Sequence, residues 1–438
     1  MAEVKNYLEP EIECAPPKKL REIQSKRLRE SVETAYENIP FYKQKFDALG
    51  ITPKDIKSIE DIVKLPFTEK TDLRDNYPFG LMAAPMSEIV RLQASSGTTG
   101  KPIVVGYTRK DLGVWYEGVA RCLTAYGVTR NDIIQVSYGY GLFTGGLGAH
   151  GGVETIGGTV IPMSSGNTQK QIQLMHDFGA NGLACTPSYA LFLAEAIRES
   201  GIPIEEFKLR IGAFGAEPWT ENMRKELEEK LRIKAYDIYG LTEISGPGVG
   251  GECEYQDGTH LWEDHFYPEI VDPKTLQPVA PGEFGELVFT TLTKEGMPMI
   301  RYRTRDLTAL NYETCRCGRT AVRMQRILGR TDDMLIIRGV NVFPSQVESV
   351  ILELEEFEPH YLIIVDRVNN LDTFQVQVEL RPAYYSDEMT RMIAIRNRVT
   401  ARLQSVLGIQ PDVKIVEPRS IERSQGKAKH VIDKRKLV

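Results

Sequence analysis

The stretch from Asp111 to Tyr239 constrains the fold more than any other part of the chain. Helical patterns, in DLGVWYEGVARCLTAYG and at Gln169–Phe178, Tyr189–Glu199 and Thr220–Leu231, alternate there with short β-rich runs such as DIIQVSYG, GLACT, LRIGAF and IKAYDIYG. This alternation is typical of parallel α/β units, because each pair of parallel strands is joined through a helical crossover. The stretch therefore predicts the parallel α/β body of a large domain.

The rest of the chain has a different pattern of predicted secondary structure. The runs GELVFTTL and MIRYRTRDL, between Thr259 and Leu328, predict an antiparallel β region. After Gly329 the order becomes strand, helix, two strands, helix and strand, which is a βαββαβ pattern. We predict an α/β protein with a large N-terminal domain, residues 1–330, and a small α+β C-terminal domain, residues 331–438. An amphipathic helix is expected from Lys18 to about Asp47.

Charge and hydropathy narrow the class of partner. The net charge is −6, from 54 Lys and Arg against 60 Asp and Glu. A dominant role on nucleic acid or on an anionic membrane is not expected, since both need a basic surface. The N-terminal MAEVKNYLEPEIE lacks the pattern of a signal peptide, and no apolar run of about 18 residues occurs. We expect a cytoplasmic protein that acts on a small solute.

The segment Leu92–Pro102, LQASSGTTGKP, predicts a loop that binds phosphate. Its glycines and hydroxyl residues can turn backbone N–H groups toward a polyphosphate. It is not a Walker A loop, which has four residues between its glycines and Ser or Thr after the lysine; Pro102 follows the lysine here. The candidate phosphate-binding residues are Ser95, Ser96, Gly97, Thr98, Thr99, Gly100 and Lys101.

Four further motifs follow this loop in order. They are YGLTE at Tyr239–Glu243, RYRTRD at Arg301–Asp306, GRTDDMLIIRGVNVFPSQVE at Gly329–Glu348 and RSQGK at Arg423–Lys427. With these residues the chain, from about Tyr42 to its end, resembles the adenylate-forming superfamily of acyl-CoA ligases, luciferases and peptide-synthetase adenylation domains. The resemblance implies an adenylate-forming N-terminal domain with a mobile C-terminal domain.

The resemblance implies a two-step reaction. ATP would first adenylate a small aromatic carboxylic acid, with Mg²⁺ as cofactor and release of pyrophosphate, and coenzyme A would then take the acyl group and release AMP. Transfer to a carrier protein or an amine is an alternative, although no appended carrier domain is visible. A nucleotide-binding regulator without catalysis is a second alternative. A homodimer would be typical of the aryl-acid branch.

The resemblance also assigns roles to single residues. Glu243 would bind Mg²⁺, since a hard cation prefers a carboxylate oxygen. Asp306 would accept hydrogen bonds from the ribose hydroxyls, and Arg330 would assist at the ribose or phosphate. Lys427 would contact the substrate carboxylate and the α-phosphate during adenylation. Lys429 is its alternative, because Glu422 stands where this motif usually has proline.

The adenine site and the hinge come from the same resemblance. Asp332 would be the hinge about which the small domain rotates between the two half-reactions, and Gly339 and Val340 would belong to the thioester-forming face. The adenine walls and the neighbouring nucleotide-binding residues would be Ala216, Glu217, Pro218, Asp237, Ile238, Tyr239, Gly240 and Thr242.

The acid needs an apolar slot with its carboxylate directed toward phosphate. The segment Ser137–Gly152, SYGYGLFTGGLGAHGG, offers aromatic residues beside many glycines, and in this branch it lines the ring pocket. Tyr138 and Phe143 are the candidate lining residues, and Gly148 is expected to leave space. The alternative is that these aromatic side chains belong to the core.

Four residues form a complete ligand set for a structural zinc ion: Cys253, His260, Cys315 and Cys317. Three thiolates and one imidazole suit tetrahedral Zn²⁺, and the CxC pair followed by Gly318 resembles a metal knuckle. His265 could replace His260. The alternative is four unconnected residues with buried, inert thiols. A zinc ion held here would stabilise the β region and would not take part in catalysis.

Overall fold

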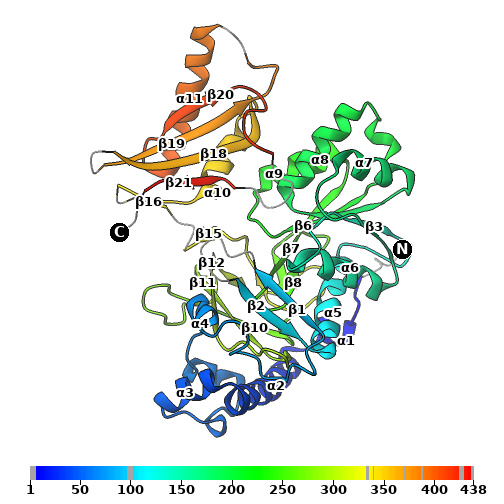
Figure 1. Cartoon of the computed structure of the whole chain (residues 1–438), viewed down its shortest axis with the longest axis vertical. Helices are drawn as coiled ribbons and strands as arrows, with labels where there is room; N and C mark the ends of the chain where they lie inside the picture. Colours follow the sequence, from blue (N-terminus) through cyan, green and yellow to red (C-terminus); the bar gives the residue numbers. More distant parts are fainter. Residues whose placement is uncertain are drawn as a thin grey trace. The chain divides into compact units, whose positions relative to one another are not determined.

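The computed structural model describes residues 6–95, 102–331, 335–338, 340–368, 371–385, 388–423 and 429–435 (Figure 1). The chain divides into two compact units. The first comprises Met1–Cys185, Ile202–Ala216 and Ile233–Arg326, and the second comprises Thr186–Gly201, Glu217–Arg232 and Ile327–Val438. The domain boundary at residue 330 stays a prediction.

A nine-stranded mixed sheet forms the centre of the first unit, in the order β13-β14-β9-β8-β7-β6-β5-β3-β4. Its parallel half is β3 (Ile133–Val136), β4 (Thr159–Pro162), β5 (Gly182–Cys185), β6 (Ile211–Gly215) and β7 (Lys234–Leu241). Its antiparallel half is β8 (Gly246–Gly251), β9 (Thr259–Leu261), β13 (Leu310–Asn311) and β14 (Arg323–Met324). The predicted parallel α/β body is confirmed, and it continues directly into antiparallel strands.

The helices α5 (Arg109–Ala125), α6 (Thr144–Ile156) and α7 (Thr168–Asp177) accompany this sheet. The sequence predicted α5 and α7 but assigned no element to α6, because glycine is a poor helix former. Packing compensates for this low propensity. The glycines of α6 let it approach α5 so closely that a Cβ at Gly151 or Gly152 would collide with Tyr116 or Val119.

Two smaller antiparallel sheets complete the first unit. One contains β10 (Phe266–Val271), β11 (Gly285–Thr291) and β12 (Tyr302–Thr308), and the other is the hairpin of β1 (Arg91–Ser95) and β2 (Ile103–Tyr107). The antiparallel region predicted from GELVFTTL and MIRYRTRDL is confirmed. None of the helices in the described ranges has the length and apolar character needed to span a bilayer.

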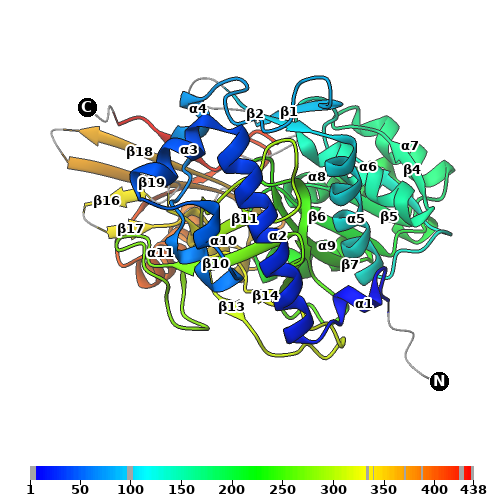
Figure 2. The same cartoon turned by 90° about the horizontal axis from the view of Figure 1, so that it is seen from below.

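The N-terminal helical stripe is interrupted. It forms α2 (Pro17–Asn38) and α3 (Pro40–Ala48), separated at Ile39, because the residue before a proline is pushed into extended backbone. Helix α2 lies across the antiparallel strands (Figure 2), where the Ser31 hydroxyl donates to the Thr291 carbonyl at 2.8 Å. The short helices of the first unit are α1 (Pro10–Glu13), η1 (Pro53–Asp55), η2 (Ile59–Lys64), α4 (Lys70–Asp75) and η3 (Ile204–Glu206).

The second unit contains a four-stranded sheet in the order β20-β19-β18-β21. Helices α10 and α11 contact each other and this sheet, and they cover its core (Figure 1). Its elements are α8 (Pro187–Ser200), α9 (Glu221–Leu231), β15 (Gly329–Arg330), β16 (Leu335–Ile337), β17 (Val340–Val342), α10 (Pro344–Glu353), β18 (Phe357–Val368), β19 (Leu371–Leu380), α11 (Met389–Leu407), β20 (Asp412–Val416) and β21 (Val431–Asp433). The predicted order is present, with β15, β17 and β21 added as strands of two or three residues.

Candidate functional site

Two of the sequence motifs meet in the first unit. Tyr239, on β7, donates its hydroxyl to the Asp306 carboxylate, on β12, at 2.7 Å. Both side chains are buried. YGLTE and RYRTRD are therefore parts of one site, although they are far apart in the sequence.

The Glu243 carboxylate lies in a tight turn that follows β7. The residue is only 7% exposed, and among the described residues no side chain or backbone group hydrogen-bonds or ion-pairs with its carboxylate. A buried carboxylate without a protein partner is costly unless a cation or another ligand compensates it. The nearby Thr242 hydroxyl, 3.3 Å from that of Thr144, is a second oxygen donor. This donor set fits Mg²⁺, which prefers oxygen ligands.

The candidate adenine residues of the first unit lie on the ends of neighbouring strands. Gly215, at the end of β6, pairs with Ile238 on β7, and Ala216 follows with φ of +73°. Asp237 is fixed through its backbone, since its N–H donates to Glu252 at 2.8 Å and its carbonyl accepts from Tyr126 at 2.8 Å. Ala216, Asp237 and Ile238 thus occupy the carboxyl ends of parallel strands, where ligands bind in open α/β sheets.

Gly240 and Glu217 each have a structural contact within their own unit. A Cβ at Gly240 would collide with the Gly246 carbonyl oxygen, so only glycine permits this approach of β7 and β8. In the second unit, the Glu217 carboxylate accepts from the backbone N–H of Ser188 at 2.7 Å and from the Ser188 hydroxyl. Pro218 follows it directly.

The arginines of RYRTRD are structural in this unit. Arg301 forms two hydrogen bonds to Glu269, at 3.0 and 2.9 Å, and Arg303 forms two to Glu286, at 3.0 and 2.8 Å. Such bidentate pairs are the strongest carboxylate contacts available to arginine. They fix the strand that carries Asp306.

The candidate residues of the acid pocket follow β3 and lie along α6. Tyr138 is buried after β3, whereas Phe143 is 39% exposed at the start of α6. Helix α6 packs closely at Gly148, where a Cβ would lie 2.7 Å from Pro247 and 2.8 Å from the Trp115 ring. The part of these three residues in binding the acid stays a prediction.

Several predicted residues lie outside the described ranges. They are Ser96, Gly97, Thr98, Thr99, Gly100, Lys101, Asp332, Gly339 and Lys427. Ser95 is described as the last residue of β1, Arg330 as the last of β15 and Val340 as the first of β17.

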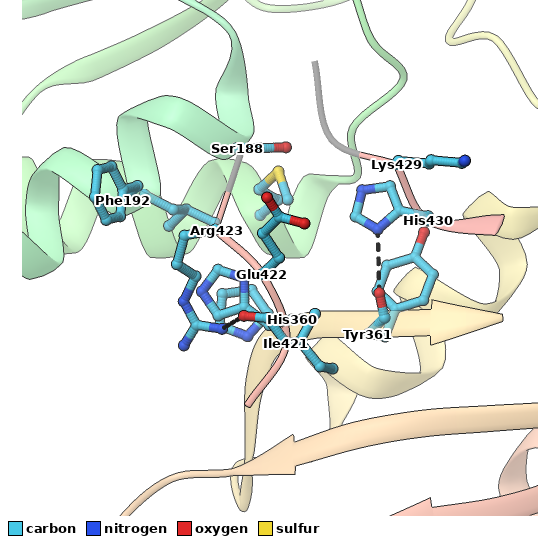
Figure 3. Close-up of a pocket in the computed structure, with 12 residues that line it drawn as sticks. Ser188, Phe192, His360, Tyr361, Ile421, Glu422, Arg423, Lys429 and His430 are labelled. Atoms are coloured by element: carbon cyan, nitrogen blue, oxygen red, sulfur yellow. Dashed lines mark hydrogen bonds between the residues drawn. The ribbon is translucent and has the colours of Figure 1, made fainter. Parts of the chain in front are cut away.

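The described part of the RSQGK segment is anchored within the second unit. Arg423 donates two hydrogen bonds to the buried Glu379 on β19, both at 2.9 Å. Lys429, the alternative to Lys427, is exposed and contributes to a pocket with Arg423 and His360, and its side chain points away from both of them (Figure 3). The segment is therefore fixed at Arg423, four residues before Lys427.

The four predicted metal ligands come together. The ligand atoms of Cys253, His260, Cys315 and Cys317 all lie within 4.8 Å of one another, and all four residues are buried. The Cys253 and Cys315 sulfurs are 3.8 Å apart, and the Cys317 sulfur is 3.6 Å from His260 Nε2. Tetrahedral zinc, with Zn–S of about 2.3 Å and Zn–N of about 2.0–2.1 Å, gives S···S and S···N separations of about 3.8 and 3.6 Å. These residues therefore fit a zinc ion, and His265 is not a member of the cluster.

The backbone that follows Cys315 and Cys317 turns as in a metal knuckle. The Gly318 N–H donates to the Cys315 carbonyl at 2.8 Å, and the Arg319 N–H donates to the Cys317 sulfur at 3.5 Å. Hydrogen bonds from Cys253 and Cys315 lower the pKa of Cys317. The buried Arg319 guanidinium pairs with Glu13 at 2.7 Å, which joins the N-terminal segment to the knuckle.

One residue of this region has no signal in the sequence. Lys294 is buried behind the Glu243 turn and donates to the carbonyls of Glu243 and Ile244 at 3.2 and 2.8 Å. Burial lowers the pKa of Lys294 to about 8, although the charges of Asp111 and Glu243 favour its ammonium form. The motif LTKEG around it gives no indication of this contact.

The fold is an α/β protein whose sequence motifs gather at the carboxyl ends of parallel strands, and its family follows from comparison. Residues 17–293 match the family described as AMP-binding enzyme, and residues 339–435 match AMP-binding enzyme C-terminal domain. The chain belongs to the AMP-binding enzyme family.

Particular relatives are similar over their whole length. The chain is 53% identical to phenylacetate-coenzyme A ligase of Escherichia coli, covering 98% of both, and 51% identical to that of Thermus thermophilus, covering 98% and 99%. Among solved structures, a 2-hydroxyisobutyryl-CoA ligase with 2-HIB-AMP has a TM-score of 0.93 at 30% identity, covering 99% of this chain and 93% of that one. The predicted adenylate-forming fold is confirmed. Within the superfamily, AYDIYGLTE, RGVNVFPSQVE and the basic tail GKAKHVIDKRK indicated a resemblance to phenylacetate-CoA ligases, and this is also confirmed.

Proposed function

We propose that this chain is an ATP-dependent ligase that joins a small aromatic carboxylic acid, phenylacetate or a close analogue, to coenzyme A. The observation that carries the proposal is the hydrogen bond from Tyr239 to Asp306, which brings together the YGLTE motif, with its buried Glu243, and the RYRTRD motif. Full-length similarity to enzymes named phenylacetate-coenzyme A ligase supports the choice of acid and acceptor.

The reaction has two half-reactions. In the first, a carboxylate oxygen of the acid attacks the α-phosphorus of ATP, the bond to the bridging oxygen breaks, and pyrophosphate leaves. In the second, the CoA thiol attacks the acyl carbon, gives up its proton, and AMP leaves. Negative charge develops at the phosphate in the first step and on the acyl oxygen in the second. N–H donors and cations held at fixed positions stabilise that charge.

The adenylation step would use the following groups of this chain. Glu243, with Thr242, would hold Mg²⁺, which supplies neutralisation of phosphate charge when bound. Asp306 would accept from the ribose hydroxyls, and Lys427 would orient the substrate carboxylate against the α-phosphate. The phosphate loop would be Ser95 to Lys101, the adenine contacts Ala216, Glu217, Pro218, Asp237 and Ile238, and the ring pocket Tyr138, Phe143 and Gly148, with Arg330 beside the ribose or phosphate.

Pyrophosphate release across a panel of aryl and alkyl acids, with and without CoA, tests this function. We expect steady turnover with phenylacetate only when CoA is present, and about one equivalent of pyrophosphate per enzyme without it. Turnover that depends on an amine or a carrier protein instead of CoA would favour the alternative acceptor. ATP binding without pyrophosphate release for any acid would favour the regulator.

We propose Asp332 as the hinge between the two half-reactions, with residues 1–330 and 331–438 as the moving domains. Because proline fixes φ near −65°, Asp332→Pro should block the rotation. We expect near-normal pyrophosphate release in a single turnover and strongly reduced acyl-CoA formation. A folded proline variant that forms thioester at the wild-type rate would contradict the hinge.

We also propose that the cluster of Cys253, His260, Cys315 and Cys317 holds a structural zinc ion. The separations of 3.8 and 3.6 Å, close to tetrahedral edges, support this. No open coordination position is needed, so the ion would have no catalytic part. We further propose that the enzyme works as a homodimer in the cytoplasm, where reducing conditions would keep its six cysteines as thiols or metal ligands.

A further inference from the structure

Lys294 is a buried cation whose contacts are backbone carbonyls. Its ammonium donates to Glu243 at 3.2 Å and to Ile244 at 2.8 Å, and it lies 5.1 Å from the centre of the Tyr107 ring. Among the described residues, no carboxylate lies within ion-pair distance of it. Burial of an ammonium group destabilises the folded state, so its presence here indicates that Lys294 has a function.

The carbonyls that Lys294 engages close the turn carrying Glu243. Tyr107 holds the next one, since its hydroxyl donates to the Ser245 carbonyl at 3.2 Å. Three consecutive carbonyls, those of Glu243, Ile244 and Ser245, are thus fixed by two side chains from elsewhere in the unit. Three carbonyls of the turn are therefore held, while no group of the described residues hydrogen-bonds or ion-pairs with the Glu243 carboxylate.

Both holding side chains are themselves fixed. Tyr107 ends β2, the strand that follows the phosphate loop in the chain. Asp111, in the first turn of α5, accepts from the N–H groups of Glu295 and Gly296 at 2.7 and 2.9 Å, directly after Lys294. The start of α5 therefore sets the position from which Lys294 reaches the turn.

We propose that Lys294 is a positioning residue for the first half-reaction: its ammonium fixes the backbone of the Glu243 turn and so orients the Glu243 carboxylate toward Mg²⁺ and the phosphates of ATP. This inference rests on the proposed role of Glu243. Lys294 itself touches no reacting atom, and its effect on adenylation passes through Glu243.

The test compares Lys294→Met with wild type in four measurements. We expect adenylation to fall by about tenfold to a hundredfold, the range that corresponds to loss of a charge-assisted hydrogen bond. The Mg²⁺ concentration needed for half-maximal pyrophosphate release should rise, and the gain in melting temperature on adding ATP with Mg²⁺ should shrink toward that with ATP alone. Thioester formation from supplied acyl-adenylate should stay near the wild-type rate, which a general loss of structure would not allow.

Glu295→Gln is the matched control. It removes the ion pair with Lys110, at 2.5 Å, and keeps the backbone N–H groups that Asp111 accepts, so Mg²⁺ dependence should not change. Should Lys294→Met not fold, Lys294→Gln keeps an uncharged NH₂ donor group, and it should show smaller changes in adenylation, Mg²⁺ dependence and the melting-temperature gain.

Glu243→Gln tests the role of Glu243 separately from that of Lys294. If Glu243 binds Mg²⁺ and Lys294 acts through it, both single variants alter Mg²⁺ dependence, and the double variant is no worse than Glu243→Gln alone. If only Glu243→Gln alters it, the inference about Lys294 is overturned and the proposed function stands. If Glu243→Gln leaves Mg²⁺ dependence unchanged, the role of Glu243 fails, and the inference fails with it.

Discussion

Protein purified without added metal is expected to contain about one zinc ion per chain, and Cys315→Ser should remove it. Two pairs of ligand atoms already stand at tetrahedral separations: the Cys253 and Cys315 sulfurs at 3.8 Å, and the Cys317 sulfur and His260 Nε2 at 3.6 Å. Loss of a structural metal is among the largest single-site effects, about 4 kcal/mol or more. At about 2–4 °C per kcal/mol, the melting temperature should fall by at least about 8 °C. Metal analysis measures the zinc content, and thermal unfolding measures the change in melting temperature.

Cys122→Ser is the matched control for this variant. Cys122 is also buried, burial raises the pKa of its thiol to about 12, and it does not belong to the cluster. This substitution should leave the zinc content unchanged, even if it lowers stability by replacing a buried sulfur with a hydroxyl. Well-folded, active wild-type protein that contains no zinc would contradict the metal site.

Phenylacetate turnover should persist in any Cys315→Ser protein that remains folded, because the proposed zinc has no open coordination position. The cluster also fastens the N-terminal segment, through the pair of Arg319 and Glu13 at 2.7 Å. Its loss should therefore free that segment to proteolysis before it affects adenylation.

Periodicity predicted the α/β body well, because a helix or strand that packs against a sheet repeats its apolar residues at a fixed spacing. The predicted helices Gln169–Phe178 and Thr220–Leu231 correspond to α7, Thr168–Asp177, and α9, Glu221–Leu231. The metal cluster was also predictable, since the chemistry of Cys and His limits what four such residues can do together.

The misses have physical causes. Helix α6 is stabilised by close contact with α5, which no local propensity reports. Pro40 predicts a helix break at Ile39, but the apolar residues continue at helical spacing past this point and favoured a single helix. Lys294 could not be found, because its contact with Glu243 exists only after β7 and β11 have folded together.

Lys427→Ala is expected to lower adenylation by about a hundredfold to a thousandfold, the usual cost of removing one electrostatic contact to a developing charge. The ammonium would bridge two anions, the substrate carboxylate and the α-phosphate, which otherwise repel each other. Thioester formation from supplied acyl-adenylate should change by less than about twofold, because the phosphate bond is already formed in that substrate. Single-turnover pyrophosphate release and acyl-CoA formation measure the two half-reactions separately.

Lys429→Ala decides between the two lysines of this segment. Lys429 is exposed, and its side chain points away from Arg423, the residue that anchors the segment to Glu379 (Figure 3). We expect Lys429→Ala to adenylate at close to the wild-type rate. Equal loss in both half-reactions for Lys427→Ala would mean that this lysine supports the fold of the segment and has no specific part in adenylation. A large loss confined to adenylation in Lys429→Ala, with Lys427→Ala unaffected, would instead assign the contact with the carboxylate and α-phosphate to Lys429.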